Sequence, residues 1–249
     1  MNYSKIYKAT LNIYQECNIN SFPLDCHDLL AHYGYQCLPY SKLSLVKREM
    51  CMNFSEDAFL FRNVLYYNDN ILPNRQRFSF MHELGHIALK HVEHPVLCQE
   101  QEANAFASHI LAPRTVIHHS GCSNESEISN IFEITVEAAH YAFADYKRWL
   151  RYRTYYKLEA LDEAIFQQFY DDDLDCFVWH RKTCVHTAKP CINRLDDCRI
   201  CKDSQSNQTY PYAGSHKHPV RSSKRYSDPM FLPDGFSRAE DFYLYGDIY

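Results

Sequence analysis

A five-residue stretch, "HELGH" at residues 82–86, holds the residue types of a metal centre. His82 and His86 are four positions apart, so on a helix their imidazoles lie on one face and can reach the same Zn²⁺. Glu83 lies beside that axis, where its carboxylate can take a proton from a water molecule polarised by the metal. The spacing predicts a catalytic zinc site that hydrolyses a peptide bond. The alternative is an ordinary helix with a polar stripe.

The residues around this motif have the periodicity of a helix. Phe78, Met81 and Leu84 recur every three residues, which predicts a helix over residues 75–91 with an apolar face beside the histidines. Gly85 lies in the middle of this helix, where glycine costs roughly 0.5–1 kcal/mol relative to alanine. The whole chain has only six glycines, so we expect a packing or active-site reason for this one.

A catalytic zinc site typically has three protein ligands, and the next predicted helix, residues 99–111, offers two acids. The buried stripe of this helix includes Ala103 and Phe106, and Glu102 lies beside it. Periodicity alone does not exclude Glu100. For either acid the alternative is a solvated helix start, where negative charge favours the helix dipole.

Two segments together resemble the ImmA/IrrE family of metallo-endopeptidases. They are "RFSFMHELGHIALKH" at residues 77–91 and "EQEANAFASHILAP" at residues 100–113. The resemblance extends upstream through "SFPLDCHDLLAHYGYQCLPYS" and downstream through "EISNIFEITVEAAHYAFADY", and it covers about residues 1–150. The two central motifs together are specific for this family. One is a helix that carries the metal motif, and the other is a second helix that ends at a proline.

The resemblance implies roles for five residues. It implies zinc ligands His82, His86 and Glu102, the general base Glu83, and a supporting role for Asn104 behind the ligands. It also implies a protein substrate, a helix-turn-helix transcriptional repressor of a mobile element or a stress response. The residue that stabilises the transition state stays open, with Tyr66, Tyr67, His109 and His140 as candidates.

The segments before the metal motif have β character. "DAFLFRNVLYYND" at residues 57–69 predicts two strands joined by a tight turn, and "QCLPY" and "MCMNF" are further short strand candidates. We therefore expect an α+β fold: a small zincin-like metalloprotease domain with a short antiparallel sheet, an active-site helix and a helical bundle, followed by a Cys-rich tail. An edge strand at Val64, Tyr66 and Asn68 could bind an extended substrate by β-pairing.

Composition divides the chain into four parts. Residues 1–158 form the peptidase-like domain, whose helical pair at 125–156 is too acidic at its start to read DNA. Residues 159–175 hold seven acids and no base, which indicates a solvated acidic connector. A Cys-rich module follows at 176–202, and residues 203–249 are a polar linker with an aromatic end.

The Cys-rich module predicts a second, structural zinc. Cys184, Cys191, Cys198 and Cys201 can close a tetrahedral thiolate site that staples a segment too small for its own core. The alternative is free thiols in a loop. Ten bases against three acids in residues 176–225 also permit a nucleic-acid partner there, although none is expected for the catalytic domain. A non-catalytic zinc-containing regulator that binds protein or nucleic acid through this module is therefore the alternative function.

The remaining composition indicates a cytoplasmic protein without a membrane partner. No apolar run reaches the roughly 18 residues of a membrane helix, and the first residues lack the apolar core of a signal peptide. The 11 cysteines are an odd number, which favours reduced thiols or metal ligands over a disulfide framework.

Overall fold

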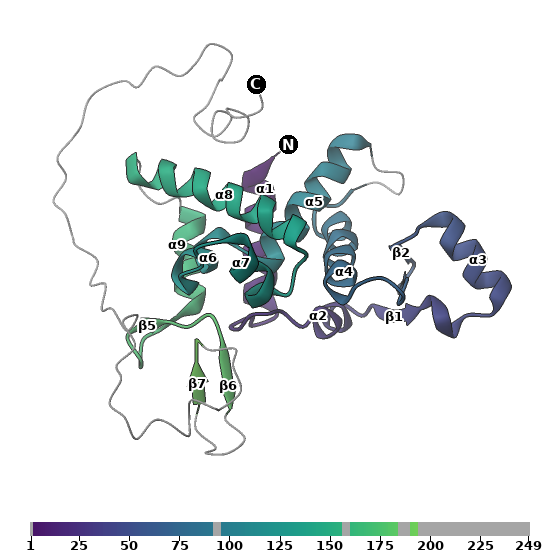
Figure 1. Ribbon diagram of the computed structural model, residues 1–249, viewed down its shortest axis with the longest axis horizontal. Helices are drawn as coiled ribbons and strands as arrows, with labels where there is room; N and C mark the ends of the chain where they lie inside the picture. Colours follow the sequence, from purple (N-terminus) through teal and green to yellow (C-terminus); the bar gives the residue numbers. More distant parts are fainter. Residues whose placement is uncertain (1, 92–95, 156–159, 184–189, 194–249) are drawn as a thin grey trace, which may run out of the picture.

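The computed structural model describes residues 2–91, 96–155, 160–183 and 190–193 (Figure 1). The helices are α1 (Tyr3–Glu16), α2 (Cys26–His32), α3 (Leu45–Phe54), α4 (Pro73–Ala88), α5 (Leu97–Leu111), α6 (Arg114–Ser120), α7 (Glu125–Phe132), α8 (Val136–Tyr155) and α9 (Ala160–Phe169). The strands are β1 (Gln36–Pro39), β2 (Ala58–Phe61), β3 (Val64–Tyr67), β4 (Tyr170–Asp171), β5 (Cys176–Phe177), β6 (Arg181–Thr183) and β7 (Pro190–Ile192). A short 3₁₀ helix, Tyr40–Lys42, follows β1.

The helix that carries the metal motif begins at Pro73 and ends at Ala88. Proline suits the first helical position, because its missing N–H would have no partner there and its φ is already helical. The prediction was wrong for "MCMNF", which forms the second half of α3 rather than a strand. The preceding Leu, Lys, Arg and Glu are good helix formers, and their preference extends through the apolar run.

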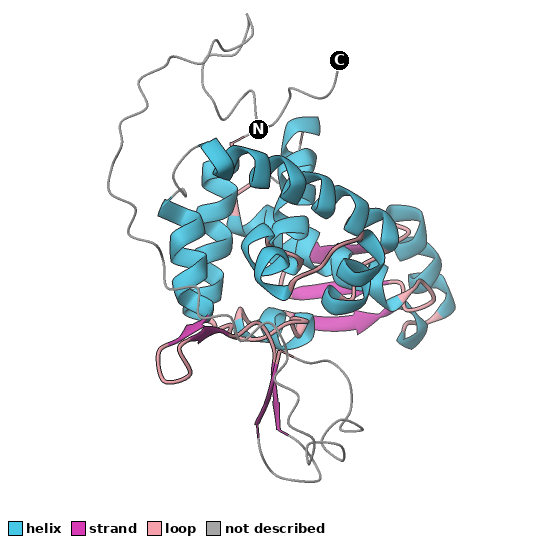
Figure 2. Ribbon diagram, turned by 60° about the vertical axis from the view of Figure 1, so that its left-hand side comes forward, coloured by secondary structure: helices cyan, strands magenta, loops and turns pink. Residues whose placement is uncertain are grey.

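The three-stranded sheet has the order β1-β3-β2, with β1 parallel and β2 antiparallel to β3 (Figure 2). The fold is therefore α+β, as expected, but its sheet is mixed rather than antiparallel. The prediction of an edge strand at Val64–Asn68 was wrong, because β3 is paired on both sides. The outer strands are β1 and β2, and β2 pairs Phe61 with Val64 across the predicted tight turn. A two-residue turn fixes this hairpin, whereas the parallel partner comes from distant sequence.

Helices α4 and α5 pack closely at Gly85, and this contact positions the metal motif. A Cβ atom on Gly85 would lie 2.9 Å from Cδ1 of Phe106 and 3.3 Å from the Cα and carbonyl oxygen of Ala103. Phe106 and Ala103 are fully buried, so neither has room to move away. The expected packing reason for the mid-helix glycine is thereby confirmed: it lets the two helix backbones approach.

Helix α9 packs into the body, although its acids suggested a solvated connector. Ile165 and Phe169 are buried in the main core beside α1, and Asp162 is only 3% exposed. The Asp162 carboxylate accepts hydrogen bonds from Nε and Nη2 of Arg114, at 3.0 and 2.9 Å. Asp162 can lie inside the protein because the buried Arg114 guanidinium balances its charge. Counting charges along the sequence could not reveal this pairing.

The segment after α9 returns to the N-terminal part of the chain. Phe177 and Trp179 are buried, and the Trp179 carbonyl accepts a hydrogen bond of 2.7 Å from the Phe22 amide. Cys191 lies on β7, but Cys184, Cys198 and Cys201 lie outside the described residues, as do residues 203–249. The structural zinc and the boundaries of the Cys-rich module therefore stay predictions.

Helix length and composition also bear on membrane insertion. Within the described part of the chain, no helix combines the length and the apolar character that a bilayer crossing requires.

Candidate metal centre

Helices α4 and α5 bring three potential metal ligands together: His82, His86 and Glu100. One ligand atom from each of these residues lies within 4.8 Å of the others. The Nε2 atoms of His82 and His86 are 2.9 Å apart. Oxygen atoms of Glu100 lie 3.2 Å from Nε2 of His82 and 3.6 Å from Nε2 of His86. It is the only such cluster among the described residues.

The spacing within this cluster fits a tetrahedral zinc ion. Zinc bonds to imidazole nitrogen and carboxylate oxygen are close to 2.1 Å, which places tetrahedral ligand atoms about 3.4 Å apart. The observed separations of 2.9, 3.2 and 3.6 Å lie around that value. The Glu100 side chain is 41% exposed, so the cluster opens to solvent on that side. Two histidines, one carboxylate and an open side are the donor set of a catalytic zinc.

The structure does not bring Glu102, the ligand implied by resemblance, to the two histidines. Its Oε1 accepts a hydrogen bond of 3.0 Å from the Asn2 amide, and its Oε2 lies 3.3 Å from Nε2 of His91. Two positions along a helix turn a side chain by about 200°, so the two acids face different ways. Glu100, not Glu102, lies beside the two histidines, and it shares a helix face with Asn104, four residues later.

Asn104 has the supporting position that was expected for it. Its Oδ1 lies 2.9 Å from Nδ1 of His82. An amide oxygen can only accept, so Nδ1 of His82 carries the proton and Nε2 presents its lone pair to the cluster. This hydrogen bond selects the tautomer of His82 that can bind a metal.

His86 is also held as a neutral ring. Burial, together with the neighbouring His82, lowers the pKa of His86 to about 4. Nδ1 of His86 lies 3.1 Å from Nδ1 of His91, on the side away from the cluster. A neutral imidazole is the form that binds a metal ion.

Glu83 lies between the metal cluster and β2, one of the two outer strands of the sheet. Its Oε2 accepts a hydrogen bond of 3.1 Å from the Leu60 amide on β2. Burial and the charge of Glu100 raise the pKa of Glu83 to about 7, although the Leu60 amide opposes this rise. A carboxylate in these surroundings takes up a proton readily, as a general base must.

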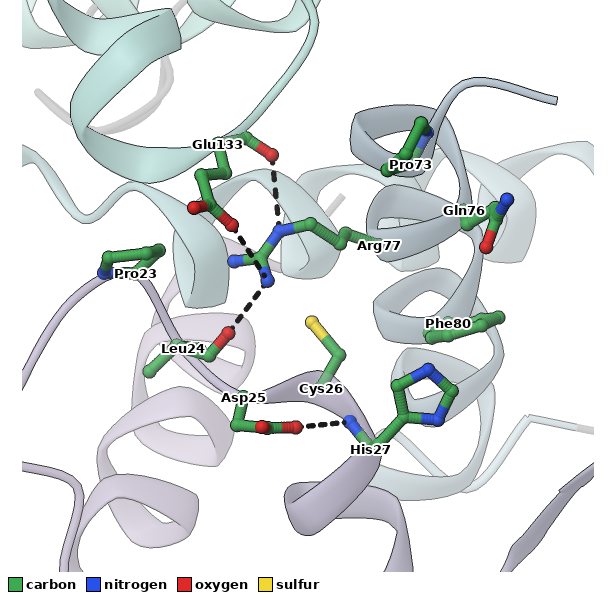
Figure 3. Close-up of a pocket in the computed structure, with 10 residues that line it drawn as sticks. All are labelled: Pro23, Leu24, Asp25, Cys26, His27, Pro73, Gln76, Arg77, Phe80 and Glu133. Carbon is green, nitrogen blue, oxygen red and sulfur yellow. Dashed lines mark hydrogen bonds and ion pairs between the residues drawn. The ribbon is translucent and has the colours of Figure 1, made fainter. Parts of the chain in front are cut away.

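A separate pocket of about 400 Å³ lies beside the first half of α4 (Figure 3). Arg77 crosses it and donates hydrogen bonds to the carbonyl oxygens of Leu24 and Glu133, at 2.8 and 3.1 Å. A third, longer bond of 3.4 Å reaches the carbonyl of Phe132. The guanidinium is therefore occupied in joining α4 to the loop before α2 and to the end of α7. None of the metal-cluster residues lines this pocket.

The candidates for a transition-state stabiliser make other contacts. Tyr66 stacks on Phe59, and His140 lies 2.9 Å from an oxygen of Glu125. His109 packs edge-on against Tyr7 and is buried. Tyr67 meets the rings of His27 and Phe80 edge-on.

Sequence reasoning missed two participants, the His91 ring and the Leu60 amide, and left Glu100 open. Asn104 carried the available signal for Glu100: a residue that supports His82 must share its helix face with the third ligand, which points to the acid four residues earlier. No comparable signal exists for His91 or Leu60, since both are brought in by tertiary packing.

The α+β fold and this donor set are compatible with a metallopeptidase. In agreement, residues 45–144, which contain the whole cluster, match the family model of the IrrE N-terminal-like domain, Peptidase_M78. This region of the chain is therefore similar to the ImmA/IrrE family of metallopeptidases, which are zinc-dependent. A search of curated proteins found no match.

Proposed function

We propose that the chain is a zinc endopeptidase that cuts a partner protein, with His82, His86 and Glu100 as metal ligands and Glu83 as the general base. The observation that carries this proposal is the convergence of three lone pairs. Asn104 directs the lone pair of His82 towards Glu100, whose carboxylate lies 3.2 Å away. Acceptors this close repel one another unless a cation lies between them.

The chemistry follows from this arrangement. Zinc, when bound, polarises a water molecule and the scissile carbonyl. Glu83 accepts the proton of the attacking nucleophile and passes it to the leaving amine. The Leu60 amide holds Glu83 in place, so the base stays directed between the sheet and the metal ligands.

The outer strand β2, rather than β3, is the proposed binding site for the substrate backbone. The Leu60 amide points away from β3, since it bonds to Glu83. An extended peptide paired along this edge would therefore pass beside the general base. Exposed apolar side chains continue the edge: Phe61 at the end of β2 and Phe54 on α3, which are 58% and 75% exposed. These features favour a polypeptide substrate.

A helix-turn-helix repressor is the substrate class we propose, on the basis of the family resemblance. Such a repressor acts in the cytoplasm, where thiols stay reduced, in keeping with the 11 cysteines of this chain. The metal ligands and Glu83 would carry out hydrolysis but would not distinguish one protein from another. We therefore expect the repressor to be recognised through contacts away from the bond that is cut.

The test is co-expression of the chain with a helix-turn-helix repressor encoded beside it. The wild-type chain is expected to cut the repressor. Glu83→Gln is expected to keep its zinc and lose cleavage by 10²–10⁴-fold or more, and His82→Ala is expected to lose both. Cleavage by Glu83→Gln at the wild-type rate would refute the mechanism. A stable complex without a cut, for the wild-type chain, would instead favour a non-catalytic regulator.

A further inference from the structure

A chain of polar contacts runs from His86 away from the metal cluster to the first turn of α1. Nδ1 of His86 lies 3.1 Å from Nδ1 of His91, and Nε2 of His91 lies 3.3 Å from Oε2 of Glu102. The other carboxylate oxygen of Glu102 accepts a hydrogen bond of 3.0 Å from the Asn2 amide. The His91 side chain is only 2% exposed, so water has little access to the two contacts that its ring makes.

The protons along this chain can be assigned from its acceptor end. The Glu102 carboxylate accepts hydrogen bonds, so Nε2 of His91 must donate. When His91 is neutral, it presents a lone pair at Nδ1, and Nδ1 of His86 carries the proton that lies between the two rings. Nε2 of His86 is left with its lone pair, facing Nε2 of His82 at 2.9 Å. Each link therefore determines the next, from the carboxylate to the metal cluster.

We propose that Glu102 and His91 are positioning residues, which fix the tautomer and ring orientation of His86 and thereby strengthen zinc binding. The proposal rests on the zinc site of the proposed function. It assigns Glu102 a role two hydrogen bonds away from the metal, in place of a ligand role. Partners of this kind typically change metal affinity by 10–100-fold.

The two histidine ligands are supported in different ways. Asn104 holds His82 directly and comes from α5, the helix that also carries Glu100. His86 is held through His91, which follows α4, and through Glu102, whose carboxylate is in turn held by Asn2. Lys5 reinforces this junction, because its Nζ donates a hydrogen bond of 2.6 Å to the Leu89 carbonyl at the end of α4. The start of α1 thus determines how one zinc ligand is presented.

The first experiment measures the zinc Kd of the full-length chain by competition with a chromogenic chelator. Glu102→Gln and His91→Phe are expected to raise the Kd by 10–100-fold. Phenylalanine keeps the buried ring of His91 but can neither accept nor donate. The matched control is Glu49→Gln, the same loss of charge on the exposed helix α3, which should leave the Kd unchanged.

The second readout is the tautomer of His86 in the zinc-free protein, from ¹H–¹⁵N correlation spectra of the histidine rings. The wild-type chain should show a proton on Nδ1 of His86, and His91→Phe should shift the proton population towards Nε2. A merely structural role for His91 would not move this signal.

Several outcomes would overturn the proposal. One is that Glu102→Gln and His91→Phe both bind zinc with the wild-type Kd. Another is that His86 keeps its wild-type tautomer in His91→Phe. Complete loss of zinc in Glu102→Gln would make Glu102 a ligand and would also refute it. If Glu102→Gln fails to fold, His91→Phe decides. Neither readout depends on cleavage, so a chain that binds zinc but cuts nothing would refute the proposed function alone.

Discussion

Within the described part of the chain, the cluster of polar side chains around Arg114 and the metal cluster differ in how hydrogen-bond donors and acceptors are matched. In the cluster around Arg114, donors meet acceptors: the guanidinium donates to both oxygens of Asp162 and to the Tyr7 hydroxyl, at 2.8–3.0 Å. Trp149 adds a further donor to Asp162 at 3.0 Å. In the metal cluster, by contrast, three hydrogen-bond acceptors face one another: Nε2 of His82, Nε2 of His86 and the Glu100 carboxylate.

This difference separates a structural cluster from a functional one. Asp162 is 3% exposed and has its charge balanced within the protein, so nothing further needs to bind there. His82, His86 and Glu100 turn lone pairs towards one another, and a cation is the group that satisfies all three. Matching donors against acceptors, rather than counting titratable residues, therefore identifies the site.

The largest effect is expected from removing a metal ligand. Glu100→Gln replaces a carboxylate with a neutral amide and should abolish stoichiometric zinc binding, because only two imidazoles remain. Metal analysis of the purified chain after dialysis measures this. The Cys-rich module could hold a zinc of its own. The zinc that Glu100→Gln retains is therefore compared with the zinc retained by His82→Ala, which lacks a different ligand of the same site. A greater loss in Glu102→Gln than in Glu100→Gln would reverse the assignment of the third ligand.

Breaking the buried ion pair should lower stability without removing zinc. Arg114→Met leaves Asp162 buried without its cation, which typically costs about 3–5 kcal/mol. Urea unfolding of the zinc-loaded chain measures the free energy of unfolding. The double variant Arg114→Met with Asp162→Leu is the control, since removing both charges should recover part of the loss. If Arg114→Met lost its zinc while remaining folded, the two clusters would not be separate.

A smaller effect is expected where α4 crosses α5. Gly85→Ala raises helix propensity but places a Cβ atom 2.9 Å from Phe106, so the net change should be a loss of roughly 1–3 kcal/mol. Thermal unfolding measures it, and Ala88→Gly, at the half-buried end of the same helix, gives the opposite exchange for comparison. A more stable Gly85→Ala chain would mean that the helices separate at little cost.

Much of the local structure followed from short-range patterns. Asp25 caps α2 by accepting hydrogen bonds from the amides of His27 and Asp28, as an acid directly before a helix commonly does. The hairpin between β2 and β3 also followed from its turn. The long-range pairing could not be predicted in this way: β1 joins β3 from a separate segment of the chain and makes β3 the central strand, so the edges of the sheet are β1 and β2.

The sequence by itself determined the chemistry of the centre. The four-residue spacing of His82 and His86 holds for any α-helix, and Glu83 follows from the same geometry. Tertiary structure decided which acid lies beside the two histidines. Glu100 and Glu102 stand on one helix, and the choice between them depends on how α5 is rotated where Gly85 meets Ala103. That rotation is set by packing between helices; spacing along α5 shows only that Glu100 shares a helix face with Asn104.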